Sequence, residues 1–421
     1  MNERIFYAAI TAIIVLGGIG IGVAYHDSVA AAPSSPSSPG SSSTQATTVQ
    51  PYQLTLVITT QNYFNATAGQ QPAFFVLQNN TLLSSENIKL PANVPIQLTI
   101  RNYDDGAAAT NSTYSKVVGT YNDQVSVYNE TLIQSYAIDP TSTAASGIAI
   151  TGGITTTYVD NNSISHTFTI FSNTTHNVVV NVPIMASTVE QTTFILNQPG
   201  GYYWQCEAGC GDPNGFTGAM STPGWMTGYV NVANMSLSKQ PYNLNLIVVP
   251  HQPWNASAGE HQPAFIVLSN GALSSSANIS LPANTEIETN IFNFDTWGPL
   301  AQDSYANVTG TVGGKVFYLN DSMVNSTVTG SQANPTGISV SGGQWASTVP
   351  VAQVSHTFTI ALGSSNINIP IADSSTVSTS FYINQTGTFS WACWDACGSG
   401  TNGMEGAMVS PGWMTGSVYV Y

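Results

Sequence analysis

The chain has 421 residues, which is too long for one ordinary domain and suits two domains with additional segments. Apolar residues make up 42% of the chain and aromatic residues 10%, so it can build cores, whereas charged residues reach only 6% against a usual ~25%. The 21 acidic and 6 basic residues leave a net charge of -15, which excludes nucleic acid as a partner because almost nothing could neutralise phosphates.

The first 31 residues predict a membrane anchor. Ile5 to Ala24 is an uncharged run of apolar and small residues, long enough to cross a bilayer as a single helix. Arg4 precedes it and Asp27 follows it, which by the positive-inside tendency places the N-terminus in the cytoplasm. The alternative is a cleaved signal peptide, because "SVAAA" offers small residues to a peptidase, but the apolar run is long for a signal sequence. Both interpretations export the rest of the chain.

Residues 32–49 follow as a Pro/Ser-rich linker, "APSSPSSPGSSSTQATTV", whose composition cannot form a core. Asn-x-Ser/Thr sequons recur along the chain beyond it, and they agree with a glycosylated protein outside the cytoplasm. We therefore expect a single-pass protein of the cell membrane with its folded part on the extracytoplasmic side.

The remainder of the chain is an internal repeat. The segment "QPYQLTLVITTQNYFNATAGQQPAFFVL" at Gln50 returns as "QPYNLNLIVVPHQPWNASAGEHQPAFIVL" at Gln240, and "GWMTGYVNV" at Gly224 returns as "GWMTGSVYV" at Gly412. The match runs nearly end to end, so it predicts two homologous domains, residues 50–236 and 240–421.

Each repeat has the pattern of β-structure. Runs such as "YQLTLVIT", "HTFTIF" and "GYVNV" alternate apolar and polar residues and favour β-branched types, with "LPAN" and "QPGG" supplying turns between them. Several short strands per repeat indicate an all-β fold, a Greek-key sandwich or barrel. The stretch from Asp104 to Asn162 is less regular, and we expect it to carry extra strands.

Residues that can bind a metal recur in the same order in both repeats. Both contain a His, two Cys four positions apart and two Met: His166, Cys206, Cys210, Met220 and Met226 in the first, and His356, Cys393, Cys397, Met408 and Met414 in the second. Imidazole, thiolate and thioether together are the donor set of copper, and the sulfur donors suit Cu(I) in particular. The His begins one strand and the sulfur residues lie between the last two, so we expect them to meet at one end of each domain.

The segments "GGYYWQCEAGCG…GWMTGYVNV" and "GTFSWACWDACG…GWMTGSVYV" resemble the copper loop of cupredoxins, in particular that of cytochrome c oxidase subunit II. The resemblance implies two tandem cupredoxin-like Greek-key sandwiches and one or two copper ions in each. It implies that the His and the Cys pair of each repeat bind copper with Met226 or Met414 as the weak ligand, and that in a dinuclear CuA site both thiolates bridge the two ions.

The sequence departs from that family in two respects, a missing His and a loop that is longer than the usual spacing. The family has a His between the second Cys and the Met, and neither loop here contains one. A complete CuA site is therefore not expected, and Met220 and Met408 are candidates to replace the imidazole in a sulfur-rich site.

Three functions remain open from the sequence. The first is copper-based electron transfer, resembling an oxidase subunit II, with redox proteins or oxidase subunits as partners and no catalytic residues of its own. The second is a glycosylated surface or filament scaffold in which each Cys pair is a disulfide, as an oxidising exterior permits. The third is capture and delivery of Cu(I).

Overall fold

The structure is a computed structural model. It describes residues 51–421 except 61, 66–68, 131, 133–134, 139–147, 152, 211–216, 236–239, 254–260, 297–302, 332–333 and 399–402. The predicted anchor, Ile5 to Ala24, and the linker at 32–49 lie outside the described residues. Among the described residues, no helix has the length and apolar character needed to cross a bilayer. The described residues form one compact unit.

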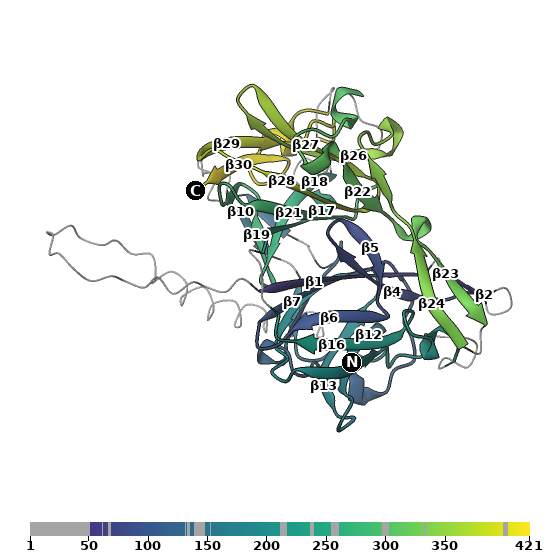
Figure 1. The fold of residues 1–421 in the computed structure, drawn as a ribbon. Helices are drawn as coiled ribbons and strands as arrows, with labels where there is room; N and C mark the ends of the chain where they lie inside the picture. Colours follow the sequence, from purple (N-terminus) through teal and green to yellow (C-terminus); the bar gives the residue numbers. More distant parts are fainter. Residues whose placement is uncertain are drawn as a thin grey trace, which may run out of the picture. The chain divides into compact units, whose positions relative to one another are not determined.

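The prediction of an all-β protein is confirmed for the part of the chain that the structure describes (Figure 1). The first half contains a seven-stranded sheet, whose order is β11 (Ile154–Thr156), β8 (Val125–Tyr128), β14 (Val189–Phe194), β7 (Ile96–Asn102), β1 (Tyr52–Thr59), β4 (Ala73–Gln78) and β5 (Thr81–Ser84). It also contains a five-stranded sheet, with the order β13 (Val178–Met185), β12 (Ile164–Ser172), β15 (Gly200–Gln205), β16 (Thr227–Ala233) and β6 (Asn87–Pro91).

The second half repeats this topology strand for strand. Its seven-stranded sheet has the order β19 (Ala272–Ser275), β18 (His261–Ser269), β17 (Tyr242–Pro253), β21 (Glu286–Asn293), β28 (Thr376–Tyr382), β22 (Val316–Leu319) and β25 (Gln344–Ala346). Its five-stranded sheet has the order β20 (Asn278–Leu281), β30 (Thr415–Val420), β29 (Gly387–Ala392), β26 (Val354–Leu362) and β27 (Ser365–Ala372). Each of these four sheets takes all its strands from one half, so the sheets follow the internal repeat.

Smaller elements complete the described part of the chain. Three hairpins pair β2 (Tyr63–Asn65) with β3 (Gly69–Gln70), β9 (Ser135–Ile138) with β10 (Ile148–Thr151), and β23 (Asn325–Ser331) with β24 (Asn334–Ser341). The helical segments are short 3-10 turns: η1 (Ser112–Ser115), η2 (Tyr121–Asp123), η3 (Gly218–Ser221), η4 (Asp303–Ala306), η5 (Val312–Gly314), η6 (Asp321–Met323), η7 (Val351–Gln353) and η8 (Gly406–Val409). The irregular stretch from Asp104 to Asn162 supplies β8 and β11 to a sheet, so the prediction of extra strands there is confirmed.

The core of each half lies between its two sheets. In the first half, Leu56 and Ile58 of β1 belong to the same buried cluster as Phe168 and Ile170 of β12. Successive side chains of a strand point to opposite faces, so Leu56 and Ile58 share one face of β1, and Phe168 and Ile170 share one face of β12. Two sheets that pack face to face around such a cluster form a β-sandwich.

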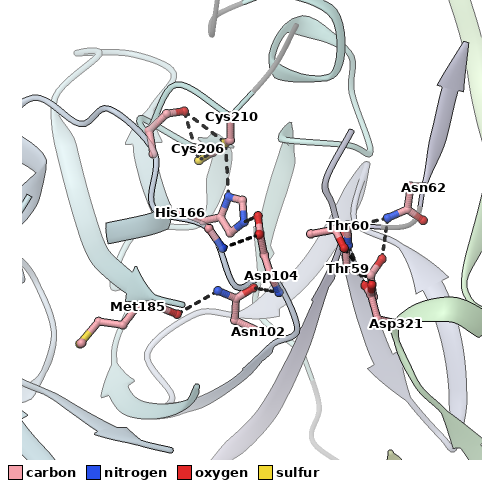
Figure 2. Close-up of polar contacts among 12 residues, drawn as sticks. Thr59, Thr60, Asn62, Asn102, Asp104, His166, Met185, Cys206, Cys210 and Asp321 are labelled. Carbon is pink, nitrogen blue, oxygen red and sulfur yellow. Dashed lines mark hydrogen bonds and ion pairs between the residues drawn. The ribbon is translucent and has the colours of Figure 1, made fainter. Parts of the chain in front are cut away.

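Contacts also join the two halves. Asp321 of the second half accepts hydrogen bonds from the amide and the hydroxyl of Thr60, each at 2.8 Å (Figure 2). The buried Arg101 guanidinium lies 4.4 Å from the centroid of the Tyr103 ring and 4.1 Å from that of Phe294. A cation between two aromatic faces is stabilised by their quadrupoles, which compensates part of the cost of burying its charge.

Candidate metal centres

The His of each cluster is placed by a β-bulge. β12 pairs with β13, and the register shifts between Ile164 and His166, so that Ser165 is an extra residue without a partner in β13. The same shift occurs in β26 between Val354 and His356. A bulge re-aims the side chain that follows it. Both His side chains are fully buried, with their rings edge-on to Phe74 and to Phe265.

The cysteines reach the His because their loop starts on a neighbouring strand. β15 pairs antiparallel with β12, and Cys206 follows the last residue of β15, so the loop begins beside the first residues of β12. Thr167 donates its amide to Cys206 Sγ at 3.4 Å, and the Cys206 amide donates to the Met226 carbonyl at 2.8 Å. The structure therefore brings His166, Cys206 and Cys210 together at the end of the strands that carry them.

In the first centre the donor atoms form a compact group (Figure 2). His166 Nδ1 lies 3.3 Å from Cys210 Sγ, which lies 3.3 Å from Cys206 Sγ. Met220 Sδ, on η3, lies 3.4 Å from Cys210 Sγ. The carbonyl oxygen of Ala208 lies 3.2 Å from Cys210 Sγ. The His and both Cys each offer one ligand atom, and these atoms lie within 4.8 Å of one another.

The second centre has the same composition. Cys393 Sγ and Cys397 Sγ are 3.7 Å apart, and Met408 Sδ on η8 lies 3.4 Å from Cys397 Sγ. His356, Cys393 and Cys397 again bring their ligand atoms within 4.8 Å of one another. His356 Nδ1 is buried and makes no hydrogen bond within the described part of the chain. A metal ion would satisfy this atom, so the residues present fit the binding of a metal.

The structure distinguishes the two Met residues of each half. Met220 Sδ and Met408 Sδ, from the predicted replacements for the missing imidazole, each contact the second cysteine of their centre. Met226 and Met414 are fully buried, and their carbonyls accept the amides of Cys206 and Cys393. Their role as weak ligands stays a prediction.

A carboxylate that the sequence analysis missed holds each His. Asp104 Oδ2 lies 2.9 Å from His166 Nε2 (Figure 2). In the second centre Asp295 Oδ2 lies 2.8 Å from His356 Nε2. Both follow a strand of the seven-stranded sheet, opposite the strand that carries the His. A carboxylate on the outer nitrogen fixes the ring and directs Nδ1 toward the sulfur atoms. The signal was present in the sequence, because "RNYD" and "FNFD" repeat the Asp at matching positions.

In each centre the buried His and the first Cys shift each other's pKa. Burial would lower the pKa of His166, but the hydrogen bond to Asp104 and the neighbouring Cys206 outweigh it and raise the pKa to about 9. The same balance with Asp295 and Cys393 raises the pKa of His356 to about 10. Burial would raise the pKa of Cys206, yet hydrogen bonds from Cys210 and His166 lower it well below its ordinary value.

The pKa of the second cysteine of each pair shifts in the opposite direction. Burial, followed by the charge of Cys206, raises the pKa of Cys210 well above its ordinary value, and burial and Cys393 do the same to Cys397. In each centre the first cysteine of the pair is therefore the stronger acid of the two. All four cysteines are free, with sulfur separations longer than the ~2.05 Å of a disulfide bond.

Two glycines of the repeated motifs are explained by close approach. A Cβ on Gly398, directly after Cys397, would lie 2.1 Å from the Glu405 carbonyl and 2.6 Å from Met408 Cγ. A Cβ on Gly228, two residues after Met226, would lie 2.5 Å from Trp204 Nε1. The first glycine lets η8 close over the centre, and the second lets the buried Trp204 pack against β16.

No protein-family model and no curated protein sequence matches this chain. Among solved structures, the chain resembles a multicopper oxidase at 8% identity and a TM-score of 0.20, covering 88% of this chain and 89% of that one. It resembles the blue copper oxidase of Nitrosomonas europaea at 8% identity and a TM-score of 0.20, covering 88% of this chain and 85% of that one. It resembles the copper nitrite reductase of that organism at 9% identity and a TM-score of 0.18, covering 88% of this chain and 94% of that one. Similarity at this level assigns neither an activity nor a ligand to this chain.

Proposed function

We propose that the protein binds copper at both His–Cys–Cys–Met centres and transfers electrons through them. The observation that carries the proposal is the donor set, an imidazole, two cysteine sulfurs and a thioether, gathered twice within contact distance of one another. This set is soft and sulfur-rich, which selects copper over the oxygen-preferring metals. A structural zinc site has four strong ligands in tetrahedral geometry. Each centre here offers only three besides the thioether, namely the imidazole and the two cysteine sulfurs.

The burial of the centres supports electron transfer rather than catalysis on a substrate. His166 and Cys206 are fully buried, and in the second centre His356 and both Cys are at most 4% exposed. Copper bound there would supply a reversible one-electron couple. The surrounding side chains would keep water away and hold the donors in one geometry for both redox states.

We also propose the finer features that the sequence predicts: a membrane anchor at Ile5 to Ala24, an extracytoplasmic location, and a role resembling that of cytochrome c oxidase subunit II. The apolar run and the Cys-x3-Cys-Gly motif support them. The absence of the second His from both loops supports a site that differs from CuA in its ligands.

One experiment tests the function. The protein without its first 49 residues is purified, its free thiols are counted, copper is added, and metal content, absorption and electron paramagnetic resonance are recorded. Electron transfer predicts four free thiols before loading, bound copper after it, and a coloured Cu(II)–thiolate band that disappears reversibly on reduction. Copper hyperfine structure then separates one ion from two in each centre. Cys206→Ser with Cys393→Ser is the matched control and should abolish the band.

Capture of Cu(I) is the second candidate, because Met220 and Met408 stand where an imidazole is expected, and thioether favours Cu(I). It predicts tight, colourless binding and no stable Cu(II) form. Oxidised cysteines and no bound metal in the purified protein would refute both candidates and leave the scaffold function.

A further inference from the structure

The two centres differ at the residue that follows their first cysteine. In the second half this residue is Trp394, which is 39% exposed. Its indole stacks on the ring of Tyr305, with centroids 5.2 Å apart and planes 5° from parallel. In the first half the residue is Glu207, and it makes a side-chain hydrogen bond to Tyr114, the counterpart of Tyr305.

The backbone around this position is the same in both halves. The amide of Trp394 donates to Thr357 Oγ1 at 2.9 Å, and that of Glu207 donates to Thr167 Oγ1 at 2.8 Å. The tyrosine carbonyl accepts an Asn side chain at 2.9 Å in both halves. The fold therefore accepts Glu at this position as readily as Trp. The tryptophans that serve packing, such as Trp204 and Trp391, are fully buried and occur in both halves.

Trp394 is also joined closely to the second centre. It is covalently adjacent to Cys393, and it shares Thr357 with it, because the Thr357 amide donates to Cys393 Sγ at 3.4 Å. The remaining donors of this centre are almost completely buried: Cys397 is 4% exposed and Met408 is 6% exposed. The indole is thus a solvent-exposed π-system on the residue next to the buried Cys393.

Resting on the proposed function, we propose that the stacked pair Trp394–Tyr305 is the port through which the second centre exchanges electrons with an external partner. One electron leaves the reduced centre and reduces the partner, or passes in the opposite direction, and no bond or proton is involved. The partner that fits is a positively charged redox molecule with a planar aromatic edge. The flat edge stacks on the exposed indole, and the net charge of -15 attracts a cation.

The test uses tris(phenanthroline)cobalt(III), a cationic one-electron oxidant with planar aromatic ligands. Its reaction with the reduced, copper-loaded protein is followed by stopped flow in a Cys206→Ser background, so that only the second centre reports. Trp394→Leu should slow the oxidation about tenfold without changing copper content or spectrum. Trp345→Leu is the matched control, because Trp345 of the same half is 45% exposed and packs on Phe317 outside the centre.

Two further measurements make the result decisive. In metal-free protein, quenching of tryptophan fluorescence by the cobalt complex should weaken in Trp394→Leu more than in Trp345→Leu. In a Cys393→Ser background, in which only the first centre reports, Glu207→Trp should speed oxidation of the first centre. In the Cys206→Ser background, Trp394→Glu, which places the first half's residue at this position, should slow oxidation of the second centre. Equal rates of oxidation of the second centre in Trp394→Leu and Trp345→Leu would refute electron exchange through Trp394. Loss of copper from Trp394→Leu would refute it as well. A wild-type protein that binds no copper would instead refute the proposed function and the port with it, before any rate is measured.

Discussion

Removal of the carboxylate behind each His should weaken metal binding, more strongly in the second centre than in the first. Asp295 holds His356 through a contact of 2.8 Å, and its side chain is only 3% exposed, so water cannot take its place. Asp104 holds His166 at 2.9 Å, but its side chain is 17% exposed, so water can compensate in part. A hydrogen bond to a charged group contributes about 1.5–3 kcal/mol, which corresponds to roughly 10–100-fold in affinity.

The measurement is competition for Cu(I) with a chromophoric chelator. Asp295→Ala should lower the affinity of the second centre by about 10–100-fold and Asp104→Ala that of the first by less. Asn at either position keeps an acceptor but loses the charge, so its effect should be intermediate. Asp105→Asn is the control, because this exposed carboxylate neighbours Asp104 along the chain. If Asp295→Ala binds copper as tightly as the wild type does, or if Asp105→Asn weakens binding equally, the carboxylates do not position the His.

Three further predictions concern single residues. Burial raises the pKa of Glu190 to about 8, so its contribution to stability is complete below the unfolded pKa of about 4.5 and is lost as the pH rises to 8. Glu190→Gln should therefore stabilise the protein at pH 8 but not at pH 4, by about 1.4 kcal/mol for each pKa unit between the folded and unfolded states. Urea titrations at both pH values measure this, and a difference in unfolding free energy between variant and wild type that is the same at both would contradict it. Gly398→Ala should displace Met408 and weaken copper binding in the second centre alone, with the first centre as internal control in the chelator competition. Asp395 is buried beside Cys397 where the first half has Ala208, so Asp395→Asn should shift the second potential positively by about 60 mV, the one-electron equivalent of ~1.4 kcal/mol. Ala208→Asp should shift the first potential negatively, and unchanged voltammetry in either variant would refute this account.

The sequence by itself determined the β-class, the repeat and the cluster of donors. Period-2 alternation is a local property, so runs such as "HTFTIF" indicate strands without reference to the rest of the chain. The donors could be recognised because cysteine occurs only four times, and each pair recurs with a His and two Met at matching positions. Strand adjacency then placed the His and the sulfur loop at one end of the sandwich.

Only the tertiary structure decided what surrounds the donors. Asp104 reaches His166 across 62 residues and from the opposite sheet, a pairing that no local pattern encodes. The contact between Met220 Sδ and Cys210 Sγ depends on where η3 lies relative to the cysteines. Burial likewise separates Trp391, which fills the core, from Trp394, which faces solvent only three residues later. Contacts between distant segments set hydrogen bonding, burial and charge, and these quantities control whether a donor group can act as a metal centre.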